Sequence, residues 1–517
     1  MTPSRLAFCL SIGGLLASIG CATSSYTPYE TAVASTQNPL VAQYSVRHYY
    51  PGFTVWVEFG SDTNYGRQTS AVSDSRATSG GAVANVLVAG MLPQTTYHMR
   101  AHVFGPGGSW VDQDQTFTTG ALPGVNASSS GQFPGISVTL PTPGLSPAPG
   151  VELLSLASNA DASSAIQAVA VDLQGNVIWY CPGYAFPVKP MQNGHFIVVR
   201  NSSVDEIDLS CKIIRSVSVD QLNQSLQSNG FSFVIPPPLG LLGGNQLHHD
   251  VLALPNGHWI ALAQIAKSFT DLAGYPGTTN VVGDAVIDID LDGNVVWAWS
   301  AFDHLDINRH PYFGLPDWTH SNALVYTADG NLLVSMRHQS WILKLDYANG
   351  TGSGDVLWRL GEEGNFTLVG ADSSQWFYAQ HYPNILSVNG STITLAVYDN
   401  GDFRIGAGGV QCTVVPPPSN CYSRAAIFEL DEGAMLANLV WQHLPGFFSF
   451  WGGSIDVLSN GDVEFASSAA PSPLAAQINE VTPTDNPQVV WQMNTTGASA
   501  YRAYRIPSLY PGVAWQK

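Results

Sequence analysis

Two short patterns recur after residue 150, and this repetition constrains the fold more than any other feature of the chain. The first is an aspartate, a turn, and a strand that reaches tryptophan seven residues later, as in Asp172–Trp179 and Asp290–Trp297. Asp208–Arg215 keeps this spacing but ends in arginine. Looser copies, which bring the number to six, end at Trp358, Trp441 and Trp491.

The second pattern is a tight glycine turn between two apolar strands. Asn-Gly and Asp-Gly are the strongest short signals for a β-hairpin, because both residues tolerate positive φ. The pattern also occurs six times, at intervals of 51 to 73 residues. Its turns are Asn193-Gly194, Asn256-Gly257, Asp329-Gly330, Asn389-Gly390, Asn460-Gly461 and Pro511-Gly512.

The two patterns are out of phase at the ends of the repeat region. The first aspartate-to-tryptophan unit has no upstream hairpin turn, and the last hairpin, Tyr501–Gly512, has no downstream unit. Joining the two ends would complete one unit, which is how a β-propeller closes its ring and hides its strand edges. The predicted fold class is therefore all-β, with a six-bladed β-propeller of four-stranded blades over residues 150–517.

A smaller domain is expected ahead of the propeller. Residues 39–119 contain short alternating strands, such as Thr54–Phe59 and Tyr97–Val103. Tyr97 follows a turn that contains a proline, an arrangement typical of the tyrosine corner of fibronectin-type sandwiches. We expect a small fibronectin-III-like β-sandwich over this range. Residues 120–149 are rich in Gly, Pro and Ser and are interpreted as a linker.

The N-terminus has the features of a signal peptide over residues 1–22. Arg5 precedes an apolar run, Leu6–Ile19, that is short for a membrane span. Two fates of this leader remain open: lipoprotein processing with a lipid anchor at Cys21, or ordinary cleavage near Ala22. The predicted location is exported, in the periplasm or on the outer surface.

Four cysteines lie beyond the leader, and an even number in an exported protein suggests disulfides. Cys412 and Cys421 flank the proline-rich loop Pro416–Pro418, so they can pair locally. A bond between Cys181 and Cys211 is the weaker of the two predictions.

Charge and composition exclude several classes of protein. The 38 acidic and 19 basic residues give a net charge of −19, whereas a nonspecific nucleic-acid binder needs a basic face. Hydrophobic residues make up 45% of the chain, too many for a disordered acidic protein. No nucleic-acid partner is expected, and the oligomeric state, a homodimer included, is left open.

Chemistry is expected where the innermost strand of each blade begins, because these starts gather at one mouth of the central channel. Three of the six starts hold histidine, although the chain has only 13 histidines. A hydrogen bond to a loop would explain any single one, but three at equivalent positions predict a functional cluster. The residues nine or ten positions before each turn glycine are Ala185, His248 with His249 beside it, His320, His381, Trp451 and Arg502.

The hairpin around Asp329-Gly330 adds an arginine to this cluster. Counting from the turn places Arg337 opposite Asn322, with His320 two residues away on the same face. A planar guanidinium there suits a tetrahedral oxyanion such as sulfate or phosphate. The alternative is an ion pair between Arg337 and a nearby carboxylate such as Asp317.

Other chemistries have less support. Three histidines can bind zinc, but Arg337 would repel a dication, and no glutamate lies near in sequence to act as the usual base. The chain contains no G-x-S-x-G motif of a serine hydrolase, no P-loop and no dinucleotide fingerprint. No metal and no cofactor are therefore expected.

Several longer motifs resemble those of the bacterial arylsulfotransferases, the aryl-sulfate sulfotransferases. They are His248–Gly257, Asp317–Asn322, Ser335–Ser340, Gln380-His381 and Ser423–Ala425, in the family's order. The resemblance covers roughly residues 150–517 and implies an exported six-bladed propeller behind an N-terminal β-sandwich. It also implies a short-range disulfide just before the Ser-Arg motif, which Cys412 and Cys421 match.

The resemblance implies a chemistry as well. Members of the family transfer a sulfuryl group from a phenolic sulfate ester to another phenol, without a nucleotide sulfate donor, through a sulfated histidine. By position, the nucleophile corresponds to His381, and the anion-stabilising roles correspond to Arg337, His320 and one of the pair His248 and His249. Strand parity favours His248, which matches the register of His320.

Three further residues are candidates for substrate binding. Asn322 follows from the hairpin pairing, and Arg424 and Arg502 are candidates for steering the anion or for a structural role. The expected partners are a small aryl sulfate donor and a phenolic acceptor. Two rival hypotheses stay open: a noncatalytic propeller that binds sulfated or phenolic ligands, and a metal-dependent lyase or hydrolase that uses the same histidines.

Overall fold

The structure of the protein is a computed structural model. The predicted signal peptide, Ala185 and Pro416–Pro418 lie outside the residues that it describes. Over the described chain the protein is all-β, as predicted, and its described helices are short: α1 (Val219–Ser228), α2 (Ala301–His304) and the 3-10 helix η2 (Ala348–Gly350). The described residues are 29–49, 51–74, 81–105, 108–122, 134–157, 167–182, 188–239, 246–370, 375–405, 409–412 and 421–515.

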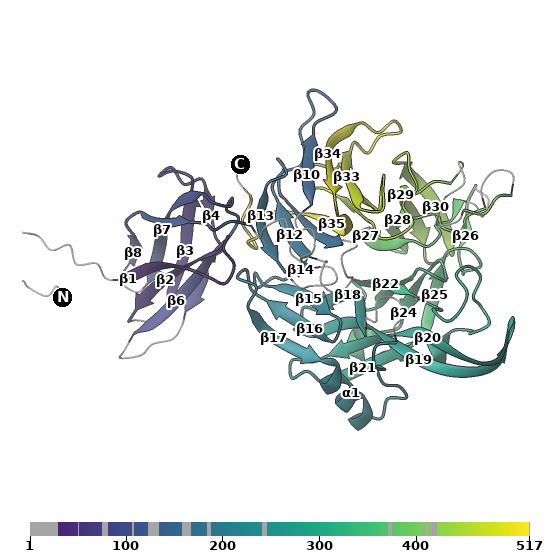
Figure 1. Ribbon diagram of the computed structural model, residues 1–517. Helices are drawn as coiled ribbons and strands as arrows, with labels where there is room; N and C mark the ends of the chain where they lie inside the picture. The colour runs from purple at the N-terminus through teal and green to yellow at the C-terminus, as the bar shows by residue number, and fades with distance from the viewer. Residues whose placement is uncertain are drawn as a thin grey trace, which may run out of the picture.

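Two antiparallel sheets form the N-terminal part of the described chain (Figure 1). Residues of β2 (Ala42–His48) and β3 (Phe53–Gly60) alternate between buried and half-buried positions, and the two sheets share one apolar core. The Tyr97 hydroxyl accepts a hydrogen bond from the backbone N–H of Leu92 at 3.0 Å, the contact expected of a tyrosine corner. One sheet contains β1 (Glu30–Ser35), β2 (Ala42–His48) and β6 (Ala82–Val88). The other contains β3 (Phe53–Gly60), β4 (Arg67–Gln68), β5 (Val72–Asp74), β7 (Thr96–Gly105), β8 (Gly108–Val111) and β9 (Gln115–Thr118).

From residue 135 onward, the described strands form six further sheets. In hydrogen-bonded order they are β13-β12-β11-β35, β14-β15-β16-β17, β18-β19-β20-β21, β22-β23-β24-β25, β27-β28-β29-β30-β26 and β31-β32-β33-β34-β10. The bounds are β10 (Gly135–Thr139), β11 (Val151–Ala157), β12 (Gln167–Val171), β13 (Val177–Cys181), β14 (Lys189–Pro190), β15 (Phe196–Arg200), β16 (Ser203–Ile207), β17 (Ile213–Ser218), β18 (Leu247–Ala253), β19 (Trp259–Leu272), β20 (Tyr275–Ile289), β21 (Val295–Ser300), β22 (Ser321–Tyr326), β23 (Leu332–Met336), β24 (Trp341–Leu345), β25 (Val356–Leu360), β26 (Thr367–Leu368), β27 (His381–Asn389), β28 (Thr392–Asp399), β29 (Arg424–Asp431), β30 (Leu436–His443), β31 (Ser454–Val457), β32 (Val463–Ser468), β33 (Ala475–Val481), β34 (Val489–Thr496) and β35 (Ser499–Ile506).

The first strands of successive sheets lie next to one another around a common centre. Strand β22 packs between β18 and β27 (Figure 1). Strand β27 also packs beside β31, and β18 packs beside β15, the second strand of its sheet. The two ends of the region meet in one sheet, because β35 pairs antiparallel with β11 from Val151 opposite Ile506 to Ala157 opposite Ser499. This is the joining of chain ends that the sequence patterns predict.

The repeated tryptophans link each sheet to the next. The indole N–H of each donates to a turn of the neighbouring sheet: Trp179 to the Leu209 carbonyl at 2.7 Å, Trp297 to Gly352 at 3.0 Å, Trp358 to the Glu432 carboxylate at 2.7 Å, Trp441 to Thr484 at 3.3 Å and Trp491 to Leu173 at 3.0 Å. Arg215, which replaces the tryptophan in the remaining copy, donates to the carbonyls of Asp290 and Gly257 and lies 3.7 Å from the centre of the Trp259 ring. These contacts join the six described sheets in cyclic order.

The glycine turns divide into two groups. The Asn-Gly and Asp-Gly turns join the first two strands of their sheets, as β18 to β19 at Gly257 and β22 to β23 at Gly330. Pro511-Gly512 differs, because it follows β35, whose partner β11 comes from the other end of the region. The stretch predicted as a linker also contains a strand: β10 pairs with β34 and widens that sheet to five strands.

A buried charge cluster lies where the ring closes. Arg505 on β35 is 2.8 Å from Glu152 on β11, 2.8 Å from Glu464 on β32 and 3.1 Å from Glu480 on β33. Burial, and then the negative charge of Glu152, raise the pKa of Glu464 well above its usual value. The shift favours the neutral form of Glu464, and a neutral carboxyl lowers the charge that the seam must bury.

Within the described residues, no helix has the length and apolar character that a membrane crossing requires.

Candidate active site

The strands that carry the predicted histidines begin irregularly. The pairing register shifts near the start of β18, β22 and β27. His249, His320 and Tyr382 have φ values of 55°, 49° and 49°, a left-handed conformation that is uncommon for residues other than glycine. Bulges and left-handed residues re-aim side chains and cluster at functional sites.

The bulge in β22 changes the predicted hairpin pairing. The Arg337 N–H donates to the His320 carbonyl at 3.2 Å, and Ser321 pairs with Met336. Arg337 therefore lies opposite His320, and the predicted pairing of Arg337 with Asn322 is wrong. The count from the turn fails because Asn322 is the extra residue of the bulge.

His381 begins β27 and is 1% exposed. Its Nδ1 lies 2.7 Å from Oδ1 of Asn400, and its Nε2 accepts a hydrogen bond from the backbone N–H of Gly452 at 3.2 Å. Burial, and then the positive charge of Arg337, hold the pKa of His381 well below its usual value. This imidazole is therefore neutral near pH 7, the state in which histidine acts as a nucleophile.

One loop holds both His381 and Arg337. Nη2 of Arg337 donates to the carbonyl of Phe450 at 2.9 Å, and Gly452, two residues later, donates to His381. The loop connects β30 to β31. The predicted nucleophile and the predicted anion-binding arginine are thus brought to the same short segment.

The guanidinium of Arg337 has further neighbours. Its Nη1 lies 3.0 Å from Nε2 of His338, and its Nη2 lies 3.5 Å from the Asp402 carboxylate. The ring of Phe313 packs against it, with 4.4 Å from the guanidinium carbon to the ring centre. Burial raises the pKa of Asp402 to about 7, although the charge of Arg337 opposes this shift. Asp402 therefore titrates in the physiological range.

Asp317 organises two histidines beside Arg337. Its carboxylate lies 2.7 Å from Nδ1 of His320, and its backbone carbonyl accepts a hydrogen bond from Nδ1 of His338 at 2.7 Å. The His320 and His338 rings stack, with their centres 4.4 Å apart. Burial, and then the charges of His320 and Arg337, lower the pKa of His338 well below its usual value. The expectation of an Asp317–Arg337 pair is replaced by an Asp317–His320 pair.

Of the adjacent pair on β18, His249 is the one that meets the other candidates. Its ring centre lies 4.8 Å from that of His320, while His248 lies 3.1 Å from the Asp284 carboxylate. The two histidines approach through their Nδ1 atoms at 2.7 Å. The strand-parity argument for His248 does not hold, because the register shifts between Leu247 and Val251.

Tyr501 lies between the histidines. Its ring centre is 5.8 Å from that of His249 and 5.8 Å from that of His381. Trp451, which occupies the equivalent strand start on the neighbouring sheet, stacks on Tyr501 at 6.2 Å. The two aromatic rings give the histidine cluster an apolar wall.

The three secondary candidates, Asn322, Arg502 and Arg424, form hydrogen bonds or ion pairs with neighbouring residues of the chain. The Asn322 amide donates to the Gln380 carbonyl at 2.7 Å, next to His381. Buried Arg502 donates to the Asn322 carbonyl and lies 3.4 Å from Asp250. Arg424 donates to Asp399 at 2.7 Å, to Gln442 at 2.7 Å and to two backbone carbonyls, contacts that fit the structural role better than anion steering.

Both predicted cysteine pairs are disulfides in the structure. The Cα atoms of Cys412 and Cys421 are 5.5 Å apart, and those of Cys181 and Cys211 are 5.8 Å apart. The Phe403 N–H donates to the Cys412 carbonyl at 2.8 Å, one residue after Asp402. The first disulfide is therefore hydrogen-bonded to the segment that lies beside Arg337.

Among the described residues, Asp317, His320 and His338 form a group that could hold a metal ion, since one ligand atom from each lies within 4.8 Å of the others. The same atoms already serve the contacts described above, and Arg337 is 3.0 Å from His338. A cation bound there would face a guanidinium, which disfavours it electrostatically. Two histidines and a carboxylate are ligand types that zinc accepts, but the neighbouring guanidinium disfavours a dication at this place.

Sequence reasoning missed three residues of this cluster, namely His338, Asn400 and Asp402. His338 follows Arg337 directly, inside the motif Ser335–Ser340, so its position next to Arg337 could have identified it. Asn400 and Asp402 lie in Asp399-Asn400-Gly401-Asp402, whose composition is that of a turn. Asn400 contacts His381 and Asp402 contacts Arg337, and neither partner is close to them in the sequence.

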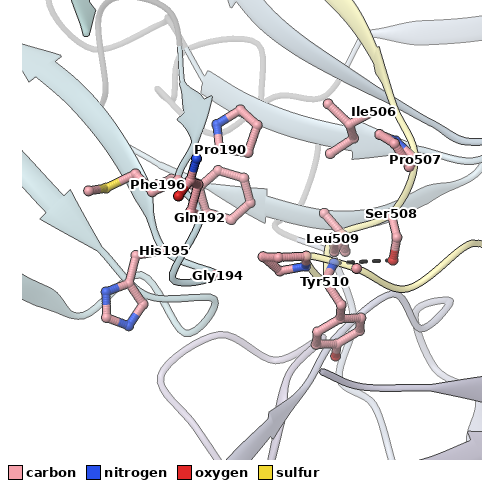
Figure 2. Close-up of a pocket in the computed structure, with 13 residues that line it drawn as sticks. Pro190, Gln192, Gly194, His195, Phe196, Ile506, Pro507, Ser508, Leu509 and Tyr510 are labelled. Atoms are coloured by element: carbon pink, nitrogen blue, oxygen red, sulfur yellow. Dashed lines mark hydrogen bonds between the residues drawn. The ribbon is translucent and has the colours of Figure 1, made fainter. Parts of the chain in front are cut away.

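A surface pocket of about 250 Å³ lies elsewhere, between the β14–β15 hairpin and the segment after β35 (Figure 2). Pro190 and Phe196 lie on one side of it, and Ile506, Leu509 and Tyr510 on the other. None of the candidate histidines lines it. The pocket is therefore not formed by the predicted site residues.

Comparisons with known proteins were made for the whole chain. The sequence profile of the family described as Arylsulfotransferase (ASST) matches residues 146–505. Similar solved structures include a protein of unknown function from Bacteroides caccae, with 11% identity, 69% of this chain and 98% of that chain covered, and a TM-score of 0.40. Another is the periplasmic gluconolactonase of Pseudomonas aeruginosa, with 11% identity, 69% and 99% covered, and a TM-score of 0.37. A comparison with curated proteins found no match.

Proposed function

Since the chain belongs to the arylsulfotransferase family over residues 146–505, we propose that it transfers a sulfuryl group from an aryl sulfate ester to a phenolic acceptor, without a nucleotide donor, through a sulfated His381. The observation that carries this proposal is the pairing of a neutral, buried His381 with Arg337 on the Phe450–Gly452 loop.

In the first half-reaction, the lone pair of His381 attacks sulfur and the bond from sulfur to the aryl oxygen breaks. The electron pair of that bond leaves with the oxygen as a phenolate. Negative charge spreads over the nonbridging oxygens, as in phosphoryl transfer, and Arg337 is placed to stabilise it. His320, paired with Asp317 at 2.7 Å, is the candidate to give the phenolate a proton.

In the second half-reaction, the accepting phenol gives its proton to His320 and its oxygen attacks sulfur. The bond between sulfur and His381 breaks, and the imidazole recovers its lone pair. His249, His338 and Tyr501 surround this space and exclude water from the sulfated intermediate. Phe313, which packs on Arg337, and Trp451 are candidates to contact the aryl ring.

The same proposal covers the architecture and location. We interpret the six cyclically linked sheets as the blades of a propeller, and the N-terminal sheets as a fibronectin-III-like sandwich with a tyrosine corner at Tyr97. An exported protein is supported by the two disulfides, which persist in oxidising compartments. The signal peptide over residues 1–22 remains a prediction.

The decisive test is a search for the covalent intermediate. A chromogenic aryl sulfate without acceptor should release a burst of about one phenol per active site and leave a sulfated protein. With acceptor, the kinetics should be double-displacement. His381→Asn should fold and lose both the burst and the label. His258→Asn, a histidine on a surface turn beside Asp288, is the matched control and should keep both. Sequential kinetics, or a label on His320 or His249, would overturn the assignment to His381.

The rival metal-dependent reaction is supported by the Asp317, His320 and His338 group. A chelator distinguishes this metal-dependent reaction from the proposed sulfuryl transfer. Transfer from the chromogenic donor to phenol should be unchanged after incubation with EDTA and removal of free metal. Loss of activity with EDTA and its return with zinc would favour the metal reaction instead.

A further inference from the structure

Both nitrogens of His381 have a defined hydrogen-bond partner. Nδ1 lies 2.7 Å from Oδ1 of Asn400, and Nε2 lies 3.2 Å from the backbone nitrogen of Gly452. We propose that Asn400 is a positioning residue that keeps the proton of neutral His381 on Nδ1, so that Nε2 is the atom that bonds to sulfur. This inference rests on the proposed function.

The orientation of the Asn400 amide is fixed by its other end. Nδ2 of Asn400 donates to the carbonyl of Ser449 at 2.7 Å and to the carbonyl of Gly452 at 3.0 Å. A flipped amide would place its oxygen against two carbonyl oxygens, which cannot donate. Oδ1 therefore faces His381, and since it can only accept, Nδ1 must carry the hydrogen.

The contact on the other side of the ring selects the same tautomer. A backbone N–H can only donate, so Gly452 requires a lone pair on Nε2 of His381. Position 452 requires glycine, because its φ is +64° and a Cβ there would lie 2.4 Å from Oγ of Ser468. Two independent contacts thus specify one protonation state of one ring.

This tautomer suits the proposed chemistry in both directions. When the Nε2 lone pair bonds to sulfur and the aryl oxygen departs with its electrons, the proton stays on Nδ1 and the ring becomes cationic. Asn400 then accepts a charge-assisted hydrogen bond, which is stronger than a neutral one. A cationic imidazole is also the better leaving group when the acceptor attacks. The Nε2 lone pair leaves the Gly452 N–H when it bonds to sulfur, and this N–H is then free to donate to a sulfuryl oxygen.

The first experiment reads the tautomer in the intact protein. The chain is produced with ¹⁵N-labelled histidine, and the His381 signals are assigned by their loss in His381→Asn. The expected result is a protonated Nδ1 and an unprotonated Nε2 at neutral pH. A protonated Nε2 would overturn the inference, and this measurement needs no Asn400 variant that folds.

The second experiment reads the position of the adduct and the rate at which it forms. Digestion of the sulfated wild type should give the Nε2 isomer of sulfohistidine. Asn400→Leu should slow adduct formation by about 10–100-fold, by analogy with the loss of the hydrogen-bond partner of a metal-ligating histidine. Asn384→Leu is the matched control, because it removes an asparagine hydrogen bond from β27, the strand of His381, to Asp456 at 2.8 Å, without removing a contact of His381.

A third variant separates positioning from mere packing. Asn400→Asp keeps an acceptor for Nδ1 and adds a negative charge, which stabilises the imidazolium. It also gives up the two donations of the amide to the Ser449 and Gly452 carbonyls, so its folding is checked by its Tm. The acidic limb of the pH profile for adduct formation should move to higher pH. A loss of activity with an unmoved limb would assign Asn400 a purely structural role.

The wild-type adduct separates failure of the proposed function from failure of this inference. If the wild type gives no adduct at His381, the proposed function fails. If the adduct forms on Nδ1, only the inference about Asn400 fails.

Discussion

The carboxylate of Asp317 lies 2.7 Å from Nδ1 of His320, whereas the carboxylate beside Arg337 belongs to Asp402. A carboxylate on Nδ1 fixes a histidine ring so that Nε2 faces away from it, and it stabilises the protonated ring. In the proposed mechanism this pair suits His320 to proton transfer, and Arg337 stabilises the sulfuryl group in competition with the Asp402 carboxylate.

Asp317→Asn should therefore weaken acid catalysis more than binding. We expect kcat to fall by about 100-fold for phenyl sulfate, whose phenolate is basic and needs a proton, and far less for 4-nitrophenyl sulfate, whose phenolate is a good leaving group. Steady-state kinetics with both donors measure the difference. Asp306→Asn, at an exposed turn, is the control. An equal loss for both donors would indicate that Asp317 only holds the loop together.

Arg337→Lys should not preserve activity. A lysine keeps the charge but cannot reproduce the planar guanidinium that spans His338 and the Phe450 carbonyl. The expected loss is about 2–4 kcal/mol of transition-state stabilisation, the size of effect seen when an oxyanion donor is removed. The measurement is kcat/KM for the aryl sulfate. If the lysine variant keeps most of its activity, Arg337 is structural.

The sequence predicts the periodic part of this protein and misses what breaks the period. The tryptophans and glycine turns recur because every sheet needs the same link to the next, and even Arg215 takes over the role of a missing tryptophan. The pairing of Arg337 and the choice between His248 and His249 fail for one reason, the register shifts of β18 and β22. A bulge moves the following side chains to the opposite face of the sheet, and the spacing of residues in the sequence does not reveal where a bulge lies.

Asn400 and Asp402 show a second limit of prediction from sequence. Their segment has the composition of a turn, and its role arises only when β28 brings it beside His381 and Arg337. His381 itself is found from its position at the start of a strand. Periodicity therefore locates the strand starts, whereas the side chains that complete the site come from loops whose course is set by tertiary packing.

The Cys412–Cys421 disulfide should support both stability and activity. It closes a loop of about ten residues, which by chain entropy contributes about 2–3 kcal/mol. Its backbone also bonds to Phe403, beside Asp402. Cys412→Ser should lower Tm and kcat, whereas Cys181→Ser, which breaks the other disulfide, should lower Tm alone. Thermal unfolding and donor kinetics measure the two effects. Equal kcat in the two variants would show that the Cys412–Cys421 loop has no influence on the site.

Asp402 should give the site a pH dependence of its own. Burial raises the pKa of this carboxyl to about 7, with the charge of Arg337 opposing the shift. At lower pH the carboxyl is neutral, and Arg337 is free to pair with a sulfate ester. At higher pH a carboxylate competes for the same guanidinium. KM for the donor should therefore rise as the pH increases above about 7, by up to about tenfold per pH unit.

Asp402→Asn removes this titration, so KM should no longer rise with pH through this group. The same variant tests the pKa through stability. Because the folded-state pKa lies above the ordinary value of 3.8, the wild type should lose stability relative to the variant as the pH rises from about 4 to about 7, by about 4 kcal/mol. Urea unfolding of both proteins at the two ends of this range measures the difference. Asp292→Asn, at an exposed turn, should follow the wild type. A KM that rises equally in wild type and Asp402→Asn would assign the pH dependence to another group.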